Sequence, residues 1–284
     1  MAAPFAFVDL PRARSAAKPR RGGLTMAIDD GLPLGAVSDL LDLAEPYLDL
    51  AKIKTGTARL YDEGYLGRKL ALYKSRRVRP FLGGQFQEYV YATQGSAALP
   101  RFYAEARRVG FEVIEISDNC VPLSPAERHH QIRLAIEHGL VVFGEVGSKD
   151  KTSTAKELVG QSEVCFAAGA ELVLVEAAEL IRKGKPNRKM LEGLRRGLDM
   201  SRVLIELPGP WISGAHHCDI EDMKKFLIAE FGPDVNLANI DPHSVIDLES
   251  MRVGLGVVGP KVTAPRSSSA RRGTADARPR QGAA

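Results

Sequence analysis

Eight short apolar runs, each ending at a charged, amide or glycine-rich tip, recur along the chain of 284 residues. They occupy residues 24–29, 48–54, 78–84, 111–118, 140–149, 172–176, 203–206 and 235–239. Stretches between them, such as 36–43, 101–108, 126–137 and 220–230, have apolar residues at the three- and four-residue spacing of amphipathic helices. Continuous apolar runs fit parallel strands that are covered on both faces. Eight such strands alternating with helices predict an α/β fold, a (β/α)8 TIM-type barrel.

The main alternative to a barrel is an open, doubly wound sheet that binds a dinucleotide. Such sheets carry a glycine-rich fingerprint where a strand passes into a helix, and none of the expected helices begins with one. The length also suits one barrel, which typically takes about 250 residues. We therefore predict a single barrel domain over 22–260, with a basic N-terminal extension at 1–21 and a basic tail at 261–284. The tail is poor in large apolar residues, so we expect it to be disordered.

The net charge of +4 belongs to the two ends of the chain rather than to the expected barrel. Residues 1–21 carry +4 and residues 261–284 carry +5, which leaves −5 for the residues between them. A mildly acidic barrel does not suit a nucleic-acid-binding protein, so nucleic acid is not an expected partner. A non-specific contact of the two basic ends with an anionic surface stays open.

The cysteine usage and the hydropathy pattern point to the cytoplasm. Cys120, Cys165 and Cys218 are scattered and lack metal-ligand spacing, which is typical of a reducing compartment. No apolar run reaches the roughly 18 residues that a membrane span requires, so a membrane is not an expected partner either. The arginines near the N-terminus leave an organelle-targeting leader as an alternative.

The barrel hypothesis brings the polar tips of all eight strands to one rim, where the active sites of such barrels lie. This rim would hold Asp29, Lys52, Lys54, Glu88, Glu115, Asp118, Glu145, Lys149, Glu176, Glu206, Asn236 and Asn239. Carboxylates that outnumber amines repel one another unless a cation lies among them, and oxygen ligands favour a hard ion such as Mg²⁺. A lysine near that ion loses its proton more readily and can exchange it with carbon, which is the chemistry of enolates.

Each of these features also has a purely structural interpretation. Glu115 and Glu145 can simply pair with Lys52 and Lys54 inside the barrel mouth. The paired glycines 83–84 can form a tight turn, or can let backbone N–H groups approach a phosphate. The residues 216–219, His-His-Cys-Asp, resemble a metal cluster, but adjacent residues point apart on regular structure. We therefore expect an exposed loop there, before a helix that begins at Asp219.

The rim residues resemble those of the phosphosulfolactate synthase family, barrel enzymes that join sulfite to phosphoenolpyruvate in coenzyme M biosynthesis. The matching positions run through nearly the whole expected barrel and keep the family's order and spacing. They are Gly23 to Thr25, Asp29, Gly31 to Pro33, Lys52, Gly56-Thr57, Gly83-Gly84, Glu88, Gly110 to Glu112, Glu115 to Asp118, Glu145 to Gly147, Lys149, Glu206, Phe231-Gly232, Val235 to Ile240, Leu248-Glu249, Arg252 and Gly254-Leu255.

The resemblance implies a Mg²⁺-dependent addition in which sulfite attacks C3 of phosphoenolpyruvate and an acid protonates C2. By analogy Lys149 is that acid, with Glu145 as the second catalytic residue. Glu115, Glu176 and Asp118 are our candidate Mg²⁺ ligands. Our candidate substrate-binding residues are Lys52, Lys54, Gly83, Gly84, Asn236 and Asn239. The partners would be these two small anionic substrates, and a homo-oligomer is left open.

The chain also departs from the family pattern. Lys54 and Gln85 stand where family members typically have a glycine and a threonine. The loops after the sixth and seventh strands, which contain Arg182, Lys183 and Trp211, differ from the family's loops. Two alternatives therefore stay open: a barrel relative that binds a ligand or takes part in stress responses without turnover, and an enzyme that adds a different nucleophile to an enol.

Overall fold

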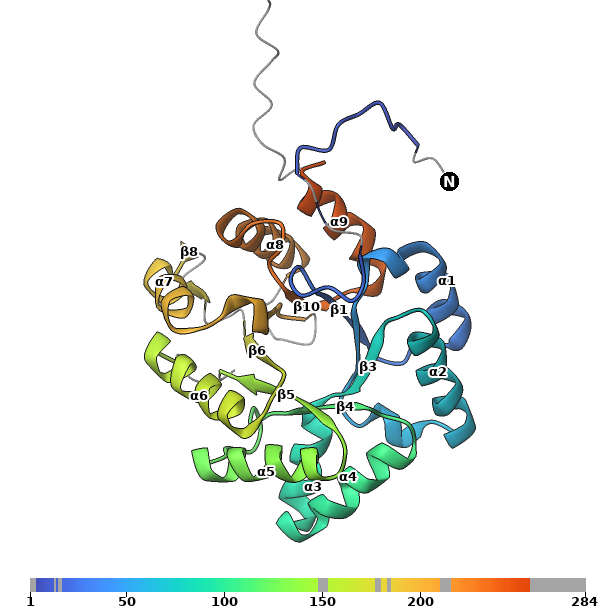
Figure 1. Cartoon of the computed structure of the whole chain (residues 1–284), viewed down its shortest axis with the longest axis vertical. Coiled ribbons are helices and arrows are strands. Elements are labelled where there is room, and N and C mark those ends of the chain that lie inside the picture. Colours follow the sequence, from blue (N-terminus) through green and yellow to red (C-terminus); the bar gives the residue numbers. More distant parts are fainter. Residues whose placement is uncertain are drawn as a thin grey trace, which may run out of the picture.

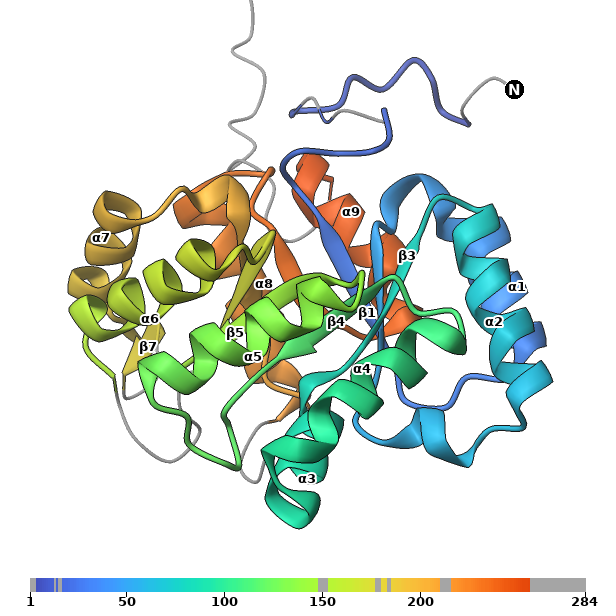
Figure 2. The ribbon, with the colours of Figure 1, turned by 60° about the horizontal axis from the view of Figure 1, so that its bottom comes forward.

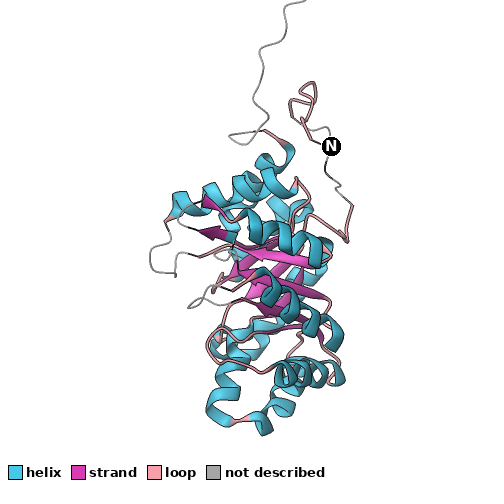
Figure 3. Ribbon diagram, turned by 90° about the vertical axis from the view of Figure 1, so that its left-hand side faces the viewer, coloured by secondary structure: helices cyan, strands magenta, loops and turns pink. Residues whose placement is uncertain are grey.

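Eight parallel strands close into a barrel in the computed structural model, which describes residues 4–12, 14, 17–147, 153–176, 180–182, 185–209 and 216–255. The strand order around the barrel is β1-β10-β9-β6-β5-β4-β3-β2, and helices surround it (Figures 1 and 3). The strands are β1 (Thr25–Asp29), β2 (Leu50–Ile53), β3 (Arg79–Leu82), β4 (Val113–Ile116), β5 (Val141–Val146), β6 (Leu172–Glu176), β9 (Val203–Glu206) and β10 (Leu237–Ile240). Because β1 pairs with both β2 and β10, the sheet has no edge, and the predicted barrel is confirmed over the open-sheet alternative.

Helices follow the strands. They are α1 (Leu34–Ala44), α2 (Glu63–Ser75), α3 (Gly84–Gln94), α4 (Leu99–Arg108), α5 (Pro125–Glu137), α6 (Ala155–Ala168), α7 (Arg188–Gly197), α8 (His217–Phe231) and α9 (Val245–Val253). The four named stretches with helical spacing, 36–43, 101–108, 126–137 and 220–230, are confirmed as helices within α1, α4, α5 and α8. A two-stranded antiparallel hairpin, β7 (Ile181–Arg182) with β8 (Lys185–Pro186), lies between β6 and α7. Helix α8 begins two residues before Asp219, and His216 caps it, so the expected loop at 217–219 is helical instead.

The apolar core has two parts, because alternate side chains of each strand point to opposite faces of the sheet. The larger part lies between the strands and the helices. The smaller part fills the inside of the barrel, where the rings of Phe81 and Phe143 meet edge to face with their centroids 5.2 Å apart. A filled interior leaves room for a ligand only at an end of the barrel.

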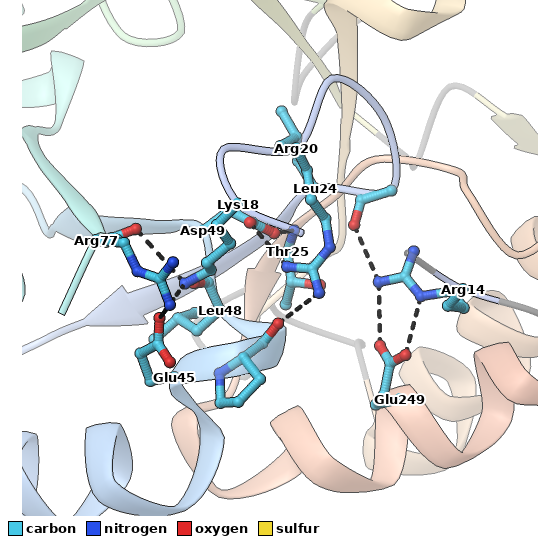
Figure 4. A network of polar contacts seen from close by, with 12 residues as sticks. Arg14, Lys18, Arg20, Leu24, Thr25, Glu45, Leu48, Asp49, Arg77 and Glu249 are labelled. Carbon is cyan, nitrogen blue, oxygen red and sulfur yellow. Dashed lines mark hydrogen bonds and ion pairs between the residues drawn. The ribbon is translucent and has the colours of Figure 1, made fainter. Parts of the chain in front are cut away.

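The N-terminal segment lies across the amino-terminal end of the barrel, whereas helix α3 lies at the opposite end (Figure 2). Three of its cations reach carboxylates of the barrel (Figure 4): Arg14 contacts Glu249 at 2.9 Å, Arg20 contacts Asp49 at 2.9 Å, and Lys18 contacts Glu45 at 3.5 Å. Gly23 has a φ of +70°, and a Cβ there would lie 2.1 Å from the Arg14 guanidinium. Part of the basic extension predicted at 1–21 is therefore packed on the barrel.

Two further expectations concern the basic tail and membrane-spanning segments. The tail predicted to be disordered, 261–284, lies outside the described residues. Among the described residues, no helix has the length and apolar character needed to cross a membrane.

Candidate active site

A layer of charged side chains closes the apolar interior at the carboxyl-terminal end of the barrel. Its members are Lys52, Glu115, Glu145, Glu176 and Glu206, and all are buried. The residue two positions before each of them belongs to the inner apolar cluster: Leu50, Val113, Phe143, Leu174 and Leu204. Because residues two apart on a strand share a face, the five charged side chains must also point into the barrel.

The ammonium of Lys52 is the centre of this charged layer. Its Nζ lies 2.9 Å from Glu115, 2.9 Å from Glu206 and 4.0 Å from Glu145. Burial on its own lowers the pKa of Lys52, but the charges of the three carboxylates outweigh burial and raise the pKa well above its ordinary value. Lys52 is therefore a cation at neutral pH. Its expected pairing with Glu115 is confirmed, and Glu206 is an equally close partner.

Two of the carboxylates hold protons much more tightly than ordinary glutamates. Burial, and then the charge of Glu115, raise the pKa of Glu145 to about 8. Burial and the charge of Glu145 raise the pKa of Glu206 to about 7. A single ammonium cannot neutralise four buried glutamates, so this layer would gain from a divalent cation.

The carboxylates of Glu145, Glu176 and Glu206 can hold such a cation, because ligand oxygens of all three lie within 4.8 Å of one another. Hard cations such as Mg²⁺ prefer carboxylate oxygens. The buried Oε2 of Glu206 has no hydrogen-bond partner among the described residues, so a metal ion there would satisfy it. The residues present therefore fit a Mg²⁺ ion.

Two of the candidate metal ligands have other partners. Asp118 pairs with Arg128 of helix α5, whose guanidinium also donates to the backbone carbonyl of Glu145 at 2.9 Å. Glu115 contacts Lys52 instead of joining the three-carboxylate cluster. Asp118 lies two residues beyond the end of β4, where the chain already turns toward α5. Of the three candidate ligands, only Glu176 belongs to the cluster.

Gly83 and Gly84 connect the end of β3 to the start of α3. The N–H of Gly83 donates to the carbonyl of Ile53 at 3.0 Å, so it is engaged within the barrel. A Cβ on Gly84 would lie 2.3 Å from the Ser117 hydroxyl, which means that glycine is needed for α3 to pack against the end of β4. This geometry matches the tight-turn interpretation. Gly83 still lines a small polar pocket, which we call the mouth; it also contains Ile28, Lys52, Lys54, Thr55, Gln85, Asn119, Glu145, Glu206 and Asn239.

The two asparagines that are candidate substrate ligands lie at opposite ends of the barrel. Asn239 lines the mouth, with a φ of +58°, and its amide donates to the Leu207 carbonyl at 3.0 Å. Asn236 precedes β10, and its side chain bonds the backbone of Leu24, Met200, Ser201 and Val203 at the amino-terminal end. The expectation that Asn236 lies at the rim is therefore wrong, since that residue comes before its strand and not after it.

Two other rim candidates stabilise loops. Asp29 accepts hydrogen bonds from Lys69 at 2.7 Å and Tyr73 at 2.9 Å, as well as from backbone N–H groups of the next turn. Glu88 binds the Ser117 hydroxyl and the N–H groups of residues 120 and 121. Both carboxylates are thus used by the fold. Lys149, the implied proton donor, lies outside the described residues, as do Lys183 and Trp211.

The structure adds Asn119 to the site, a residue that the sequence did not single out. Its amide donates a hydrogen bond to Glu145, and it lines the mouth. The only signal in the sequence is its place directly after Asp118, beyond the apolar run of the fourth strand. Glu206 was among the rim candidates without a role, and the structure places it in the three-carboxylate cluster that could hold a metal ion.

Comparison with known proteins identifies the family. Residues 13–257 match the model of the (2R)-phospho-3-sulfolactate synthase (ComA) family. The phosphosulfolactate synthase of Methanothermobacter thermautotrophicus is 30% identical over 262 residues, which cover 88% of this chain and 95% of that protein. The phosphosulfolactate synthase of Methanocaldococcus jannaschii is 32% identical, over 82% of this chain and 92% of its own length.

Among solved structures, the similarity extends to the fold alone. A 3-hexulose-6-phosphate synthase from Salmonella typhimurium superposes with a TM-score of 0.51 at 14% identity, over 81% of this chain and 98% of that one. A dihydrodipicolinate synthase from Agrobacterium tumefaciens superposes with a TM-score of 0.52 at 13% identity, over 83% of this chain and 76% of that one. Both support the barrel architecture. The family match and the two relatives show that this chain belongs to the phosphosulfolactate synthase family of enzymes.

Proposed function

We propose that this enzyme adds sulfite to phosphoenolpyruvate with the help of Mg²⁺ and forms phosphosulfolactate. The observation that carries the proposal is the cluster of Glu145, Glu176 and Glu206 beside Lys52, in a barrel of this family. Membership of an enzyme family favours catalysis over the alternative of a ligand-binding barrel without turnover.

In the proposed reaction, the sulfur lone pair of sulfite forms a bond to C3 of phosphoenolpyruvate. The π electrons of the C2–C3 double bond move toward C2, and C2 then takes a proton. No oxidant or reductant is required. A Mg²⁺ ion held by the three carboxylates would polarise the substrate carboxylate and so stabilise the negative charge that develops beside C2.

The residues of the chain supply positioning and the proton. Lys52 and Lys54 provide positive charge at the mouth for the anionic groups of the substrates. Asn119 orients Glu145 by donating to its carboxylate. We assign the proton transfer to C2 to Lys149, on the strength of its position three residues after the end of β5.

A direct assay tests this function. Purified protein is incubated with phosphoenolpyruvate, sulfite and Mg²⁺, and phosphoenolpyruvate consumption is followed with phosphosulfolactate formation. We expect consumption that requires both sulfite and Mg²⁺. Consumption that does not depend on sulfite, or none at high enzyme concentration, would refute the synthase assignment.

We also propose that the reaction takes place in the cytoplasm. Cys120, Cys165 and Cys218 all lie among the described residues, and no disulfide joins them, which is consistent with a reducing compartment.

A further inference from the structure

A second pocket, here called the side pocket, opens beside the mouth. It lies between the 3₁₀ turn Thr57–Leu60, helix α3 and the loop after β4, and its volume is about 620 Å³. The side chains of Leu60, Phe86, Tyr89, Ala92 and Val121 give it mainly apolar walls. Pockets of this size and lining commonly hold small organic ligands.

The side pocket adjoins the mouth. Thr55 and Gln85 line both of them, and Gln85 is partly buried between the two. A ligand with one end in the mouth can therefore extend past these two residues into the side pocket.

The walls of the side pocket leave apolar surface in contact with water. Leu60 is 85% exposed and Tyr89 is 61% exposed. Isolated exposed apolar residues are common, but these two line the same pocket. The acidic residue in the pocket, Glu88, is buried and bound to Ser117 and to two backbone N–H groups. The lining also includes Arg59, which is exposed. The rest of the wall is mainly apolar, so the pocket favours an apolar group.

We propose that the side pocket binds the apolar arm of a small organic acid whose anionic head occupies the mouth. The head would lie near Lys52 and Lys54, which carry positive charge at the mouth. A Mg²⁺ ion held by the three-carboxylate cluster would add to that charge. The arm would cover Leu60 and Tyr89 and remove their side chains from water. Phosphoenolpyruvate and sulfite have no such arm, so the ligand is a further substrate or an inhibitor of the same site.

A chain-length comparison tests the proposal. Methylphosphonate and hexylphosphonate share an anionic head and differ by five methylenes, and each fully buried methylene strengthens binding about fourfold. In isothermal titration calorimetry with the full-length protein and Mg²⁺, we expect hexylphosphonate to bind at least about tenfold more tightly than methylphosphonate. This is less than the gain in affinity for five fully buried methylenes, because the arm is only partly buried. Phosphoenolpyruvate should displace hexylphosphonate. Equal affinities, undetectable binding of both, or binding that phosphoenolpyruvate does not displace would each overturn the proposal.

Two variants locate the effect. The double variant Leu60→Ala, Tyr89→Ala should lose most of the gain with chain length. The control Leu43→Ala should keep it, because Leu43 is also exposed, at 67%, but lines a separate groove between α1 and the turn before α9. A different result would assign the side pocket to a contact between copies of the protein and overturn the ligand proposal. In that case the parent would self-associate in sedimentation velocity, the double variant would be monomeric, and the length of the phosphonate chain would not change the affinity. These binding measurements can be read whether or not sulfite addition is observed.

Discussion

The proton donor is the single residue on which the proposed chemistry most depends. Replacing Lys149 with Met removes the ammonium and keeps most of the apolar volume of the side chain. We expect kcat to fall by about 10² to 10⁴, the usual contribution of general acid–base catalysis, with Mn²⁺ binding unchanged. The exposed Lys156→Met variant serves as the control and should keep full activity. Turnover within a few-fold of the parent for Lys149→Met would remove this residue from the mechanism.

The proposed metal site also depends on single carboxylates. Glu206→Gln replaces a charged oxygen ligand with an amide of nearly the same shape. We expect the affinity for Mn²⁺, measured by electron paramagnetic resonance, to fall at least about tenfold. Glu112→Gln provides the comparison, because Glu112 is exposed and pairs with Lys74 at the other end of the barrel. Unchanged Mn²⁺ affinity in Glu206→Gln would show that the cluster is not the metal site.

At the scale of elements, the N-terminal segment is held to the barrel by a buried ion pair. The side chains of Arg14 and Glu249 are 4% and 9% exposed, and the guanidinium makes two contacts of 2.9 and 3.0 Å with the carboxylate. Arg14→Ala leaves Glu249 buried without its cation, which typically costs about 3 to 5 kcal/mol of unfolding free energy. Arg76→Ala should cost at most about 1 kcal/mol, because its pair with Asp42 is exposed. Equal effects of the two variants in urea denaturation would contradict a structural role of this segment.

The junction of β3 and α3 leads to a second prediction at this scale. In Gly84→Ala, the new Cβ would lie 2.3 Å from the Ser117 hydroxyl, so α3 or β4 must shift. We expect a loss of about 1 to 3 kcal/mol in unfolding free energy, the usual cost of overpacking. Gly67→Ala is the matched control within α2, where nothing lies within 4 Å of the added Cβ. That variant should be stabilised by up to about 1 kcal/mol, since alanine favours a helix interior. Destabilisation of both variants in thermal unfolding would mean that the close contact at Gly84 is not the cause.

At the scale of the whole molecule, the buried carboxylates couple stability to pH and to Mg²⁺. The pKa of Glu145 is raised to about 8 and that of Glu206 to about 7, so the folded state holds protons that the unfolded state releases. The stability that these protons contribute is present below a pH of about 4.5 and is lost as pH rises toward 8. Bound Mg²⁺ requires the ionised carboxylates, so it should stabilise the fold more as pH rises.

Calorimetry checks this coupling. We expect the increase in Tm produced by Mg²⁺ to be larger at pH 8 than at pH 6. In Glu206→Gln, both the increase and its dependence on pH should become smaller. The same increase at both pH values in the parent would contradict the link between the raised pKa values and metal binding.

Much of the architecture could be predicted from the sequence. Short apolar runs such as 172–176 are strands in the structure because they bury both faces, and stretches with helical spacing such as 126–137 are helices within a residue or two. These signals are local, since each depends on neighbouring residues of the chain and on burial. The resemblance at the strand tips also identified the family correctly.

Which side chains come together in the site could not be predicted from the sequence, because it depends on closure of the barrel. Glu115, Glu145, Glu176 and Glu206 all lie at or next to the ends of their strands, and no local pattern shows that Glu115 contacts Lys52 while the other three lie near one another. Those distances follow from the register of strands far apart in the chain, such as Glu176 opposite Glu206. The side pocket likewise joins a turn, a helix and a loop from three parts of the chain. The sequence by itself determined that polar side chains gather at the strand ends, because strands and their alternation depend on neighbouring residues. Only the tertiary structure decided which of these side chains contact one another, because closure of the barrel brings together strands that are distant in the chain.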